Sequence, residues 1–169
     1  MNISRCNFTT CVMKNRYIFA LFGFSFQKKI FLDNIEFYEM KKNENWKFLN
    51  YNVINNINLK ICGMLSVNYK NEKIFILGGF NGEEKKGVEE IYQLNLGKNM
   101  EHLDDGKAII EETHKYLKNI DKNCCYYFEN CFGSYKDVDN NLYFNAFDNH
   151  FRAHVLRADD IEHEVYYFE

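Results

Sequence analysis

The feature that most constrains the fold of this chain is a repeated series of short apolar segments separated by polar turns. The segment 17–24 (YIFALFGF) matches 73–80 (KIFILGGF), and 33–40 (DNIEFYEM) matches 87–94 (GVEEIYQL). The offset between matching residues is 56 in the first pair and 54 in the second. Because the segments are short, rich in β-branched and aromatic residues and bounded by turn residues, they predict β-strands.

Three such series follow one another along the chain. The expected strands are 17–24, 34–40 and 46–49 in the first series, 61–69, 73–79 and 88–96 in the second, and 126–132, 141–147, 150–158 and 164–168 in the third. One segment, 104–118, breaks the pattern, since acidic residues begin it and lysines end it, as suits a helix dipole. We therefore expect a short helix or a long loop there, inserted between two sheets.

Glycine and aromatic residues recur at set places in the first two series. In the second series an apolar strand ends in Gly78-Gly79, and a later strand carries Tyr92. In the first series Phe22-Gly23 replaces the double glycine, and Tyr38 and Trp46 follow. This arrangement resembles the kelch repeat, a unit of roughly 50 residues that forms one four-stranded blade of a β-propeller. The resemblance implies structural roles for Gly23, Tyr38, Trp46, Gly78, Gly79 and Tyr92.

The fold expected from the repeat is all-β, a single partial β-propeller of the kelch type over residues 1–169. Its three four-stranded antiparallel blades are placed at 12–50, 59–103 and 124–169, the last one degenerate, with an insertion at 104–122. Because propeller rings have roughly four to eight blades, three blades form an open arc. We expect this arc to be the C-terminal part of a longer propeller, with the outer faces of its end blades exposed.

Charge and cysteine usage exclude several classes of partner. The net charge is −3, and lysines and acids are interspersed, so no basic stripe is present to bind nucleic acid. The apolar run 17–26 is far shorter than the ~20 residues that cross a bilayer, so no membrane partner is expected. None of the six cysteines forms a C-x-x-C pair. They predict reduced thiols, no metal site and a cytoplasmic location.

Candidate catalytic and metal-binding patterns are weak. His150 and His154 are spaced as a metal pair on a helix, but on a strand they lie about 13 Å apart. The acidic stretch that begins at Asp137 has Leu142 where a calcium loop needs glycine. The sequence also has no nucleophile elbow and no phosphate-binding glycine loop. We expect no catalytic, cofactor or metal site, the alternatives being an enzyme on a kelch-like scaffold or a non-functional fragment.

The expected function is protein–protein interaction through loops on one face of the propeller. The loops concerned are 24–33 and 80–87, with the connections 50–58 and 97–123 beside them. The candidate contact residues are Phe24, Phe26, Phe80 and Asn81. The kelch resemblance implies a protein partner, for instance a cytoskeletal protein or a ubiquitin-ligase substrate. Association with missing blades, or self-association through the exposed end blades, is also expected.

Overall fold

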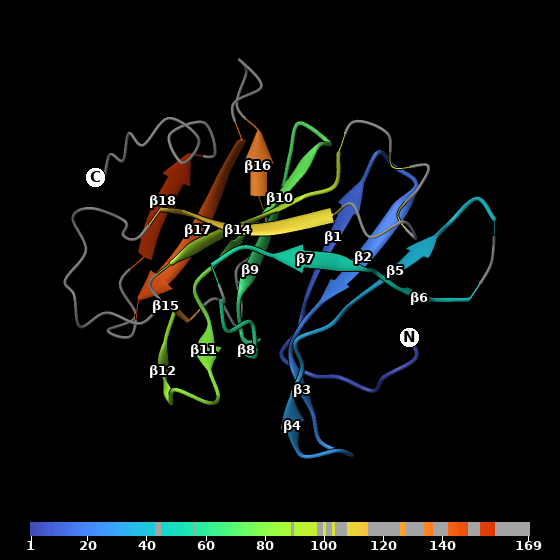
Figure 1. The fold of residues 1–169 in the computed structure, drawn as a ribbon. Coiled ribbons are helices and arrows are strands. Elements are labelled where there is room, and N and C mark those ends of the chain that lie inside the picture. Colours follow the sequence, from blue (N-terminus) through green and yellow to red (C-terminus); the bar gives the residue numbers. More distant parts are fainter. Residues whose placement is uncertain are drawn as a thin grey trace.

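The computed structural model consists of β-strands joined by short turns (Figure 1). It describes residues 1–42, 45–55, 57–88, 90–97, 100, 103 and 108–114, and then 126–127, 134–136, 142–148 and 153–157. Every named element in these residues is a strand, and all strand pairs but one are antiparallel. The prediction of an all-β fold is therefore confirmed.

The first sheet is a four-stranded antiparallel meander. Its strands, in spatial order, are β1 (Thr9–Met13), β2 (Tyr17–Leu21), β5 (Ile35–Glu39) and β6 (Lys47–Phe48). A short hairpin of β3 (Phe24–Ser25) and β4 (Ile30–Phe31) projects from the connection between β2 and β5. The sequence analysis missed β1, because its residues TTCVM carry only two strongly apolar side chains that point into the core, Cys11 and Met13.

The second sheet repeats this plan with one additional strand. Its order is β7 (Tyr51–Val53), β14 (Ala108–His114), β13 (Ile91–Asn95), β10 (Lys73–Leu77) and β9 (Leu65–Tyr69). The equivalent hairpin, β11 (Phe80–Asn81) and β12 (Lys86–Gly87), pairs with β8 (Ile61–Cys62). Strand β7 lies parallel to β14, so a segment expected to be a plain connection supplies the outermost strand.

The structure corrects the helix or long loop expected near 104–118. Residues 108–114 form β14, which pairs with β13 on one side and with β7 on the other. Ala108 and Ile110 are buried, whereas Ile109 between them is 36% exposed. This alternation has the period of a strand with one face on the core. The order of charges along the segment was misleading, because burial of alternate residues and pairing on both edges outweigh a weak helix signal.

A third group of strands lies in the C-terminal part of the chain. Strand β17 (Leu142–Asp148) pairs antiparallel with β15 (Tyr126–Tyr127), β16 (Ser134–Lys136) and β18 (Ala153–Arg157). Strands β17 and β18 fall within or close to the expected segments 141–147 and 150–158. The expected strand at 164–168 lies outside the described residues.

Strands β1 to β5 of the first unit and β9 to β13 of the second follow the sequence repeat with one constant offset of 56 residues. Both β1–β2 and β9–β10 turn through a Lys-Asn pair in which each residue has positive φ, Lys14-Asn15 and Lys70-Asn71. Positive φ at both central residues is the mark of a type I′ turn. The amide of Leu32 donates to the Gly23 carbonyl at 2.8 Å, and that of Val88 donates to the Gly79 carbonyl at 2.9 Å.

The register of the sheets shows that Tyr38 and Tyr92, which the sequence comparison matched, are not structurally equivalent. Ile18 lies opposite Tyr38 in the first sheet, and Ile74 lies opposite Leu94 in the second. The structural counterpart of Tyr38 is therefore Leu94, and Tyr92 corresponds to Glu36. The offset of 54 is wrong by two residues, because the two projecting hairpins have the same length and require no gap.

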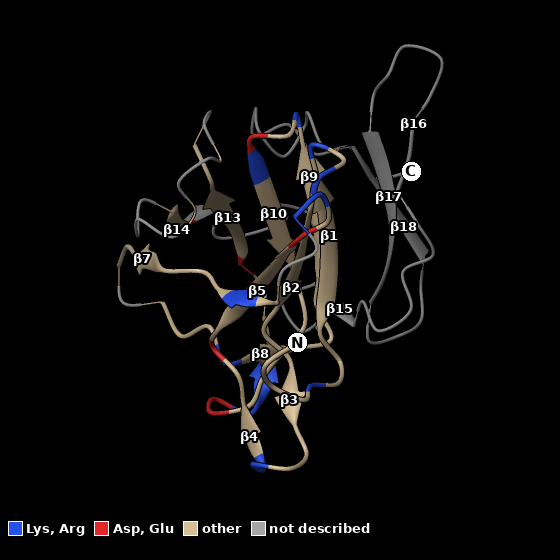
Figure 2. Ribbon diagram, turned by 90° about the vertical axis from the view of Figure 1, so that its right-hand side faces the viewer, with Lys and Arg blue, Asp and Glu red and all other residues tan. Residues whose placement is uncertain are grey.

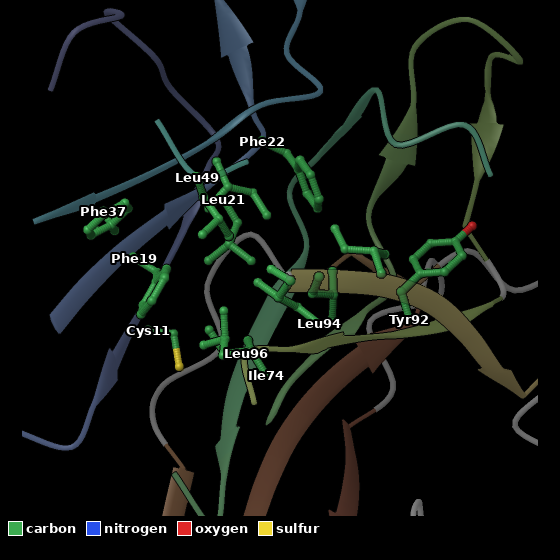
Figure 3. Close-up of a cluster of buried hydrophobic side chains, with 14 of the residues drawn as sticks. Cys11, Phe19, Leu21, Phe22, Phe37, Leu49, Ile74, Tyr92, Leu94 and Leu96 are labelled. Atoms are coloured by element: carbon green, nitrogen blue, oxygen red, sulfur yellow. The ribbon is translucent and has the colours of Figure 1, made fainter. Parts of the chain in front are cut away.

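The hydrophobic core lies between the first and second sheets. The first sheet contributes one face of its strands, including Cys11, Phe19 and Phe37, and the second contributes residues such as Ile74 and Leu94 (Figure 3). All five side chains are at most 5% exposed. This packing makes the two sheets one structural body.

Burial of Cys11 leads to a prediction about thiol reactivity. Burial raises the pKa of the Cys11 thiol to about 12, so the thiol stays protonated at pH 8. The surrounding side chains also keep reagents away from it, since Cys11 is 5% exposed. We expect Cys11 to remain unmodified by iodoacetamide in the folded protein, while the half-buried Cys6 and Cys62 are alkylated. Peptide mass spectrometry measures each site, with urea-unfolded protein as the control. Equal alkylation of Cys11 and Cys6 in the folded protein would contradict the placement of Cys11.

Candidate functional site

The candidate site is the end of the molecule from which two hairpins project. Hairpins β3–β4 and β11–β12 extend from the first and second sheets toward the same end (Figure 1). We call this region the hairpin end. It comprises residues 24–31 and 80–87, and so coincides with the two loops that the sequence predicts as partner-binding.

Four aromatic rings meet at the hairpin end. The ring of Phe24 lies 5.2 Å from that of Phe26 and 5.0 Å from that of Phe31, both in edge-on geometry. The ring of Phe31 lies 6.3 Å from that of Phe80, so contacts run from the first hairpin to the second. We call Phe24, Phe26, Phe31 and Phe80 the phenylalanine cluster. Edge-to-face pairs at such distances are favourable and hold the rings in fixed positions.

The structure thus brings together three of the four candidate residues and adds Phe31, which the sequence analysis missed. The ring of Phe31 lies directly on the backbone of Gly82 in the second hairpin. A Cβ atom at Gly82 would be 2.0 Å from this ring, so only glycine permits the contact. The pairing of an aromatic residue in one hairpin with a glycine in the other is the signal that could have identified Phe31.

The members of the phenylalanine cluster differ in exposure. Phe26 is 75% exposed, whereas Phe24, which contacts it, is half-buried, as are Phe31 and Phe80. Ile30, close to the hairpin tip, is 48% exposed. The hairpin end therefore presents one large apolar side chain that is held on a base of packed rings.

Asn81 has a different place from the one expected. Its side chain is inside the second hairpin and is only 4% exposed. The Oδ1 atom accepts hydrogen bonds from the amides of Glu83 at 3.0 Å and Glu84 at 3.1 Å, and Nδ2 donates to the Asn58 carbonyl at 3.5 Å. Ser25 has the equivalent place in the first hairpin, where Oγ accepts from the Lys28 amide at 3.4 Å. Both side chains shape their hairpins.

Charged residues occur in both of the hairpins that carry the phenylalanine cluster. Lys28 and Lys29 lie at the tip of the first hairpin, and the second carries a mixed set of acids and lysines (Figure 2). Lys60 Nζ forms an ion pair with Glu83 and donates a hydrogen bond to it. This hydrogen bond, with another from Asn58 Nδ2 at 2.8 Å, holds the pKa of the Glu83 carboxyl below its ordinary value. The two hairpins therefore carry charges of both signs beside the aromatic residues.

A small cavity adjoins the second hairpin. It has a volume of about 180 Å³ and is lined by Asn55, Ile57 and Asn58, by the hairpin itself and by Tyr92. Ligand pockets for small molecules have volumes of about 300–1,000 Å³. The size and the polar, open mouth of this cavity do not favour a small-molecule site.

The residues expected to be structural lie in the scaffold. A Cβ atom at Gly23 would be 2.6 Å from the Cys6 carbonyl oxygen, and one at Gly79 would be 2.7 Å from that of Cys62. Gly78 also has positive φ, at 63°. The ring of Tyr38 stacks on that of Trp46 at 5.6 Å, and Tyr92 lies in the core. The backbone geometry of the three glycines and the packing of the three aromatic residues support structural roles, and none of the six lies in the hairpin end.

Metal-binding clusters and membrane-spanning helices are both absent from the described part of the chain. No three His, Cys, Asp or Glu side chains gather there in a way that could hold a metal ion. Nor do these residues include a helix with the length and hydropathy that a membrane crossing demands. His154 belongs to β18, whereas His150 and Asp137 lie outside the described residues.

Two comparisons with known sequences give no match. No protein-family model matches the chain, and no curated protein matches it. The geometry of the hairpin end is therefore the basis on which a function can be proposed.

Proposed function

We propose that the chain is a partial β-propeller of the kelch type that binds a protein partner through the hairpin end, without catalysis of its own. The observation that carries the proposed interaction is the phenylalanine cluster, with Phe26 presented to solvent on a base of packed aromatic rings. In this proposal the protein acts in the cytoplasm, with neither nucleic acid nor membrane as its partner.

The propeller arrangement is supported by the way the two sheets meet. Their innermost strands, β1 and β9, lie side by side, as the inner strands of adjacent blades do. Thr9 Oγ1 and Ser66 Oγ are 2.8 Å apart, and Asn68 Nδ2 donates to the Val12 carbonyl at 2.8 Å. The shared positive φ at Gly23 and Gly79, 96° and 97°, supports the same repeat.

A protein partner fits the chemistry of the hairpin end. Binding surfaces between proteins concentrate affinity in a few aromatic anchors surrounded by a polar rim. Phe26 is such an anchor, and the lysines and acids of the hairpin tips form the rim. Because the ring of Phe24, itself packed against Phe31, already contacts the ring of Phe26, less conformational entropy is lost when a partner covers Phe26.

The test is the substitution Phe26→Ser. Phe26 is 75% exposed, so serine removes the anchor while leaving the core intact. The matched control is Val12→Ser, which removes an apolar side chain that is 47% exposed and lies at the end of β1 away from the hairpin end. The unmodified chain and both variants are immobilised and used to capture proteins from a lysate of the source organism, and recovery is quantified by mass spectrometry.

A specific partner is expected to be recovered equally by the unmodified chain and Val12→Ser, and at least about tenfold less by Phe26→Ser, as for an interface hot spot. Circular dichroism checks that both variants fold. If Phe26→Ser recovers every protein at the level of the unmodified chain, the hairpin end is not the binding surface.

A further inference from the structure

The first sheet has a face that points away from the second sheet and is mostly apolar; its Glu36 is buried against Arg5. Alternate side chains on its strands face the core, and those between them face the opposite way. Val12, Ile18 and Tyr38 are of the second kind, and they lie side by side across β1, β2 and β5. We call this surface the far face; it comprises Val12, Ile18, Tyr38, Met40, Trp46 and Phe48. Val12 is 47%, Phe48 46% and Met40 38% exposed.

The repeat shows what covers this face elsewhere in the molecule. At the offset of 56 residues, Ile18, Tyr38 and Met40 correspond to Ile74, Leu94 and Leu96 of the second sheet. These three counterparts are at most 6% exposed and belong to the core between the sheets. The far face of the first sheet is thus equivalent to the face that the second sheet buries against the first.

The surface that covers the second sheet has a defined chemistry. It is an antiparallel sheet whose apolar face carries aromatic residues such as Phe19 and Phe37 (Figure 3). The same unit also supplies β7, which extends the outer edge of the second sheet beyond β14. Among the described strands, none extends the first sheet beyond β6 in the same way. Both the face and the edge of the first sheet therefore remain available for one partner of this kind.

The path of the chain agrees with such a partner. At the offset of 56 residues, Asn2 corresponds to Asn58, which follows β7 on the path of the chain into the second sheet. Asn2 Nδ2 donates to the Trp46 carbonyl at 2.8 Å, so the chain enters the first sheet beside the beginning of β6. A unit joined on the N-terminal side would reach this point along the β6 edge, as β7 reaches Asn58 along the edge of β14.

We propose that the far face is a docking surface for a further repeat unit of the same kind, joined on the N-terminal side. That unit packs an aromatic sheet face on Ile18 and Tyr38 and adds a strand to β6. The proposal uses no residue of the hairpin end, so it stands or falls independently of the protein partner proposed above.

The test supplies the additional unit from the chain's own sequence. Residues 1–56 are duplicated ahead of Met1, which preserves the period of 56 residues. Trp46 is replaced by phenylalanine in the duplicated segment only, so that the single original tryptophan reports on the far face. The control carries Phe19→Asp and Phe37→Asp in the duplicated segment, which removes the docking surface and leaves the length unchanged.

The duplicated chain is expected to show a melting temperature about 5 °C or more above that of the unmodified chain. Acrylamide quenching of Trp46 is expected to fall at least about twofold, and the control should retain the quenching of the unmodified chain. Unchanged quenching in the duplicated chain, whether or not the added segment folds, would overturn the proposal. So would a dimer of the unmodified chain that Ile18→Lys converts to a monomer, since a second copy would then cover the far face.

Discussion

Replacing Gly79 by alanine is expected to reduce the free energy of unfolding by about 2–5 kcal/mol. The residue has a φ of +97°, in the region that L-residues avoid. A Cβ atom would also lie 2.7 Å from the Cys62 carbonyl oxygen and 2.8 Å from Ile61 Cγ2. The backbone strain accounts for about 1–2 kcal/mol of the loss and the steric overlap for about 1–3 kcal/mol.

Gly97→Ala separates the two contributions. Gly97 also has positive φ, at +73°, but beyond its chain neighbours no atom lies within 4 Å of the place that its Cβ would take. Only the backbone strain of about 1–2 kcal/mol is expected there. Urea unfolding followed by circular dichroism measures both variants. Equal losses in the two variants would show that the contact between Gly79 and the Cys62 carbonyl is not tight.

The second large effect is expected at the buried ion pair between Arg5 and Glu36. Arg5 Nη2 lies 2.5 Å from Glu36 Oε1, and neither side chain is exposed to solvent. The guanidinium also donates to the Phe22 carbonyl at 2.9 Å and to Asn34 Oδ1 at 2.8 Å. Arg5→Ile leaves the Glu36 carboxylate buried without its counter-charge. The expected loss is about 3–5 kcal/mol of unfolding free energy.

The second repeat unit indicates which double substitution should repair this loss. Ile61 and Tyr92 occupy the positions equivalent to Arg5 and Glu36, and both are buried. Arg5→Ile combined with Glu36→Tyr replaces the charges by the apolar pair that already fits this position. We expect the double variant to recover more than half of the stability lost by Arg5→Ile alone, because a buried ion pair can be exchanged for packed apolar side chains.

Urea unfolding of the two single variants and the double variant forms a thermodynamic cycle. Glu36→Tyr alone serves as the matched control, since it leaves the Arg5 guanidinium buried and unbalanced. If the losses of the single variants simply add in the double variant, Arg5 and Glu36 do not stabilise the fold as a pair.

Most strands could be predicted from sequence where apolar residues are dense, as in β2 and β10. Strand β14 could not, because acids before it and a lysine after it imitate a helix, and its alternation becomes informative only when a neighbouring sheet covers one face. Strand β7 is three residues long and pairs with residues 57 positions further on, so no local pattern marks it. Its role depends on tertiary pairing.

The candidate site was predictable in part for similar reasons. Phe24, Phe26 and Phe80 stand out because they are aromatic residues in expected loops. Phe31 joins them only because Gly82, in the other hairpin, leaves room for its ring. Asn81 was expected at the surface. Its side-chain oxygen instead turns inward, because it accepts hydrogen bonds from the backbone amides of Glu83 and Glu84. Both outcomes depend on contacts made in three dimensions.

The position of β7 determines where the chain can be divided. By sequence Tyr51–Val53 ends the first repeat, but by pairing it belongs to the second sheet. The two repeats are therefore interlocked and cannot be exchanged as independent cassettes. A C-terminal fragment that begins after β7 would lose the outer strand of the second sheet and leave the backbone of β14 open to strands of other chains, a recognised route to aggregation. A boundary between β6 and β7 keeps that edge protected.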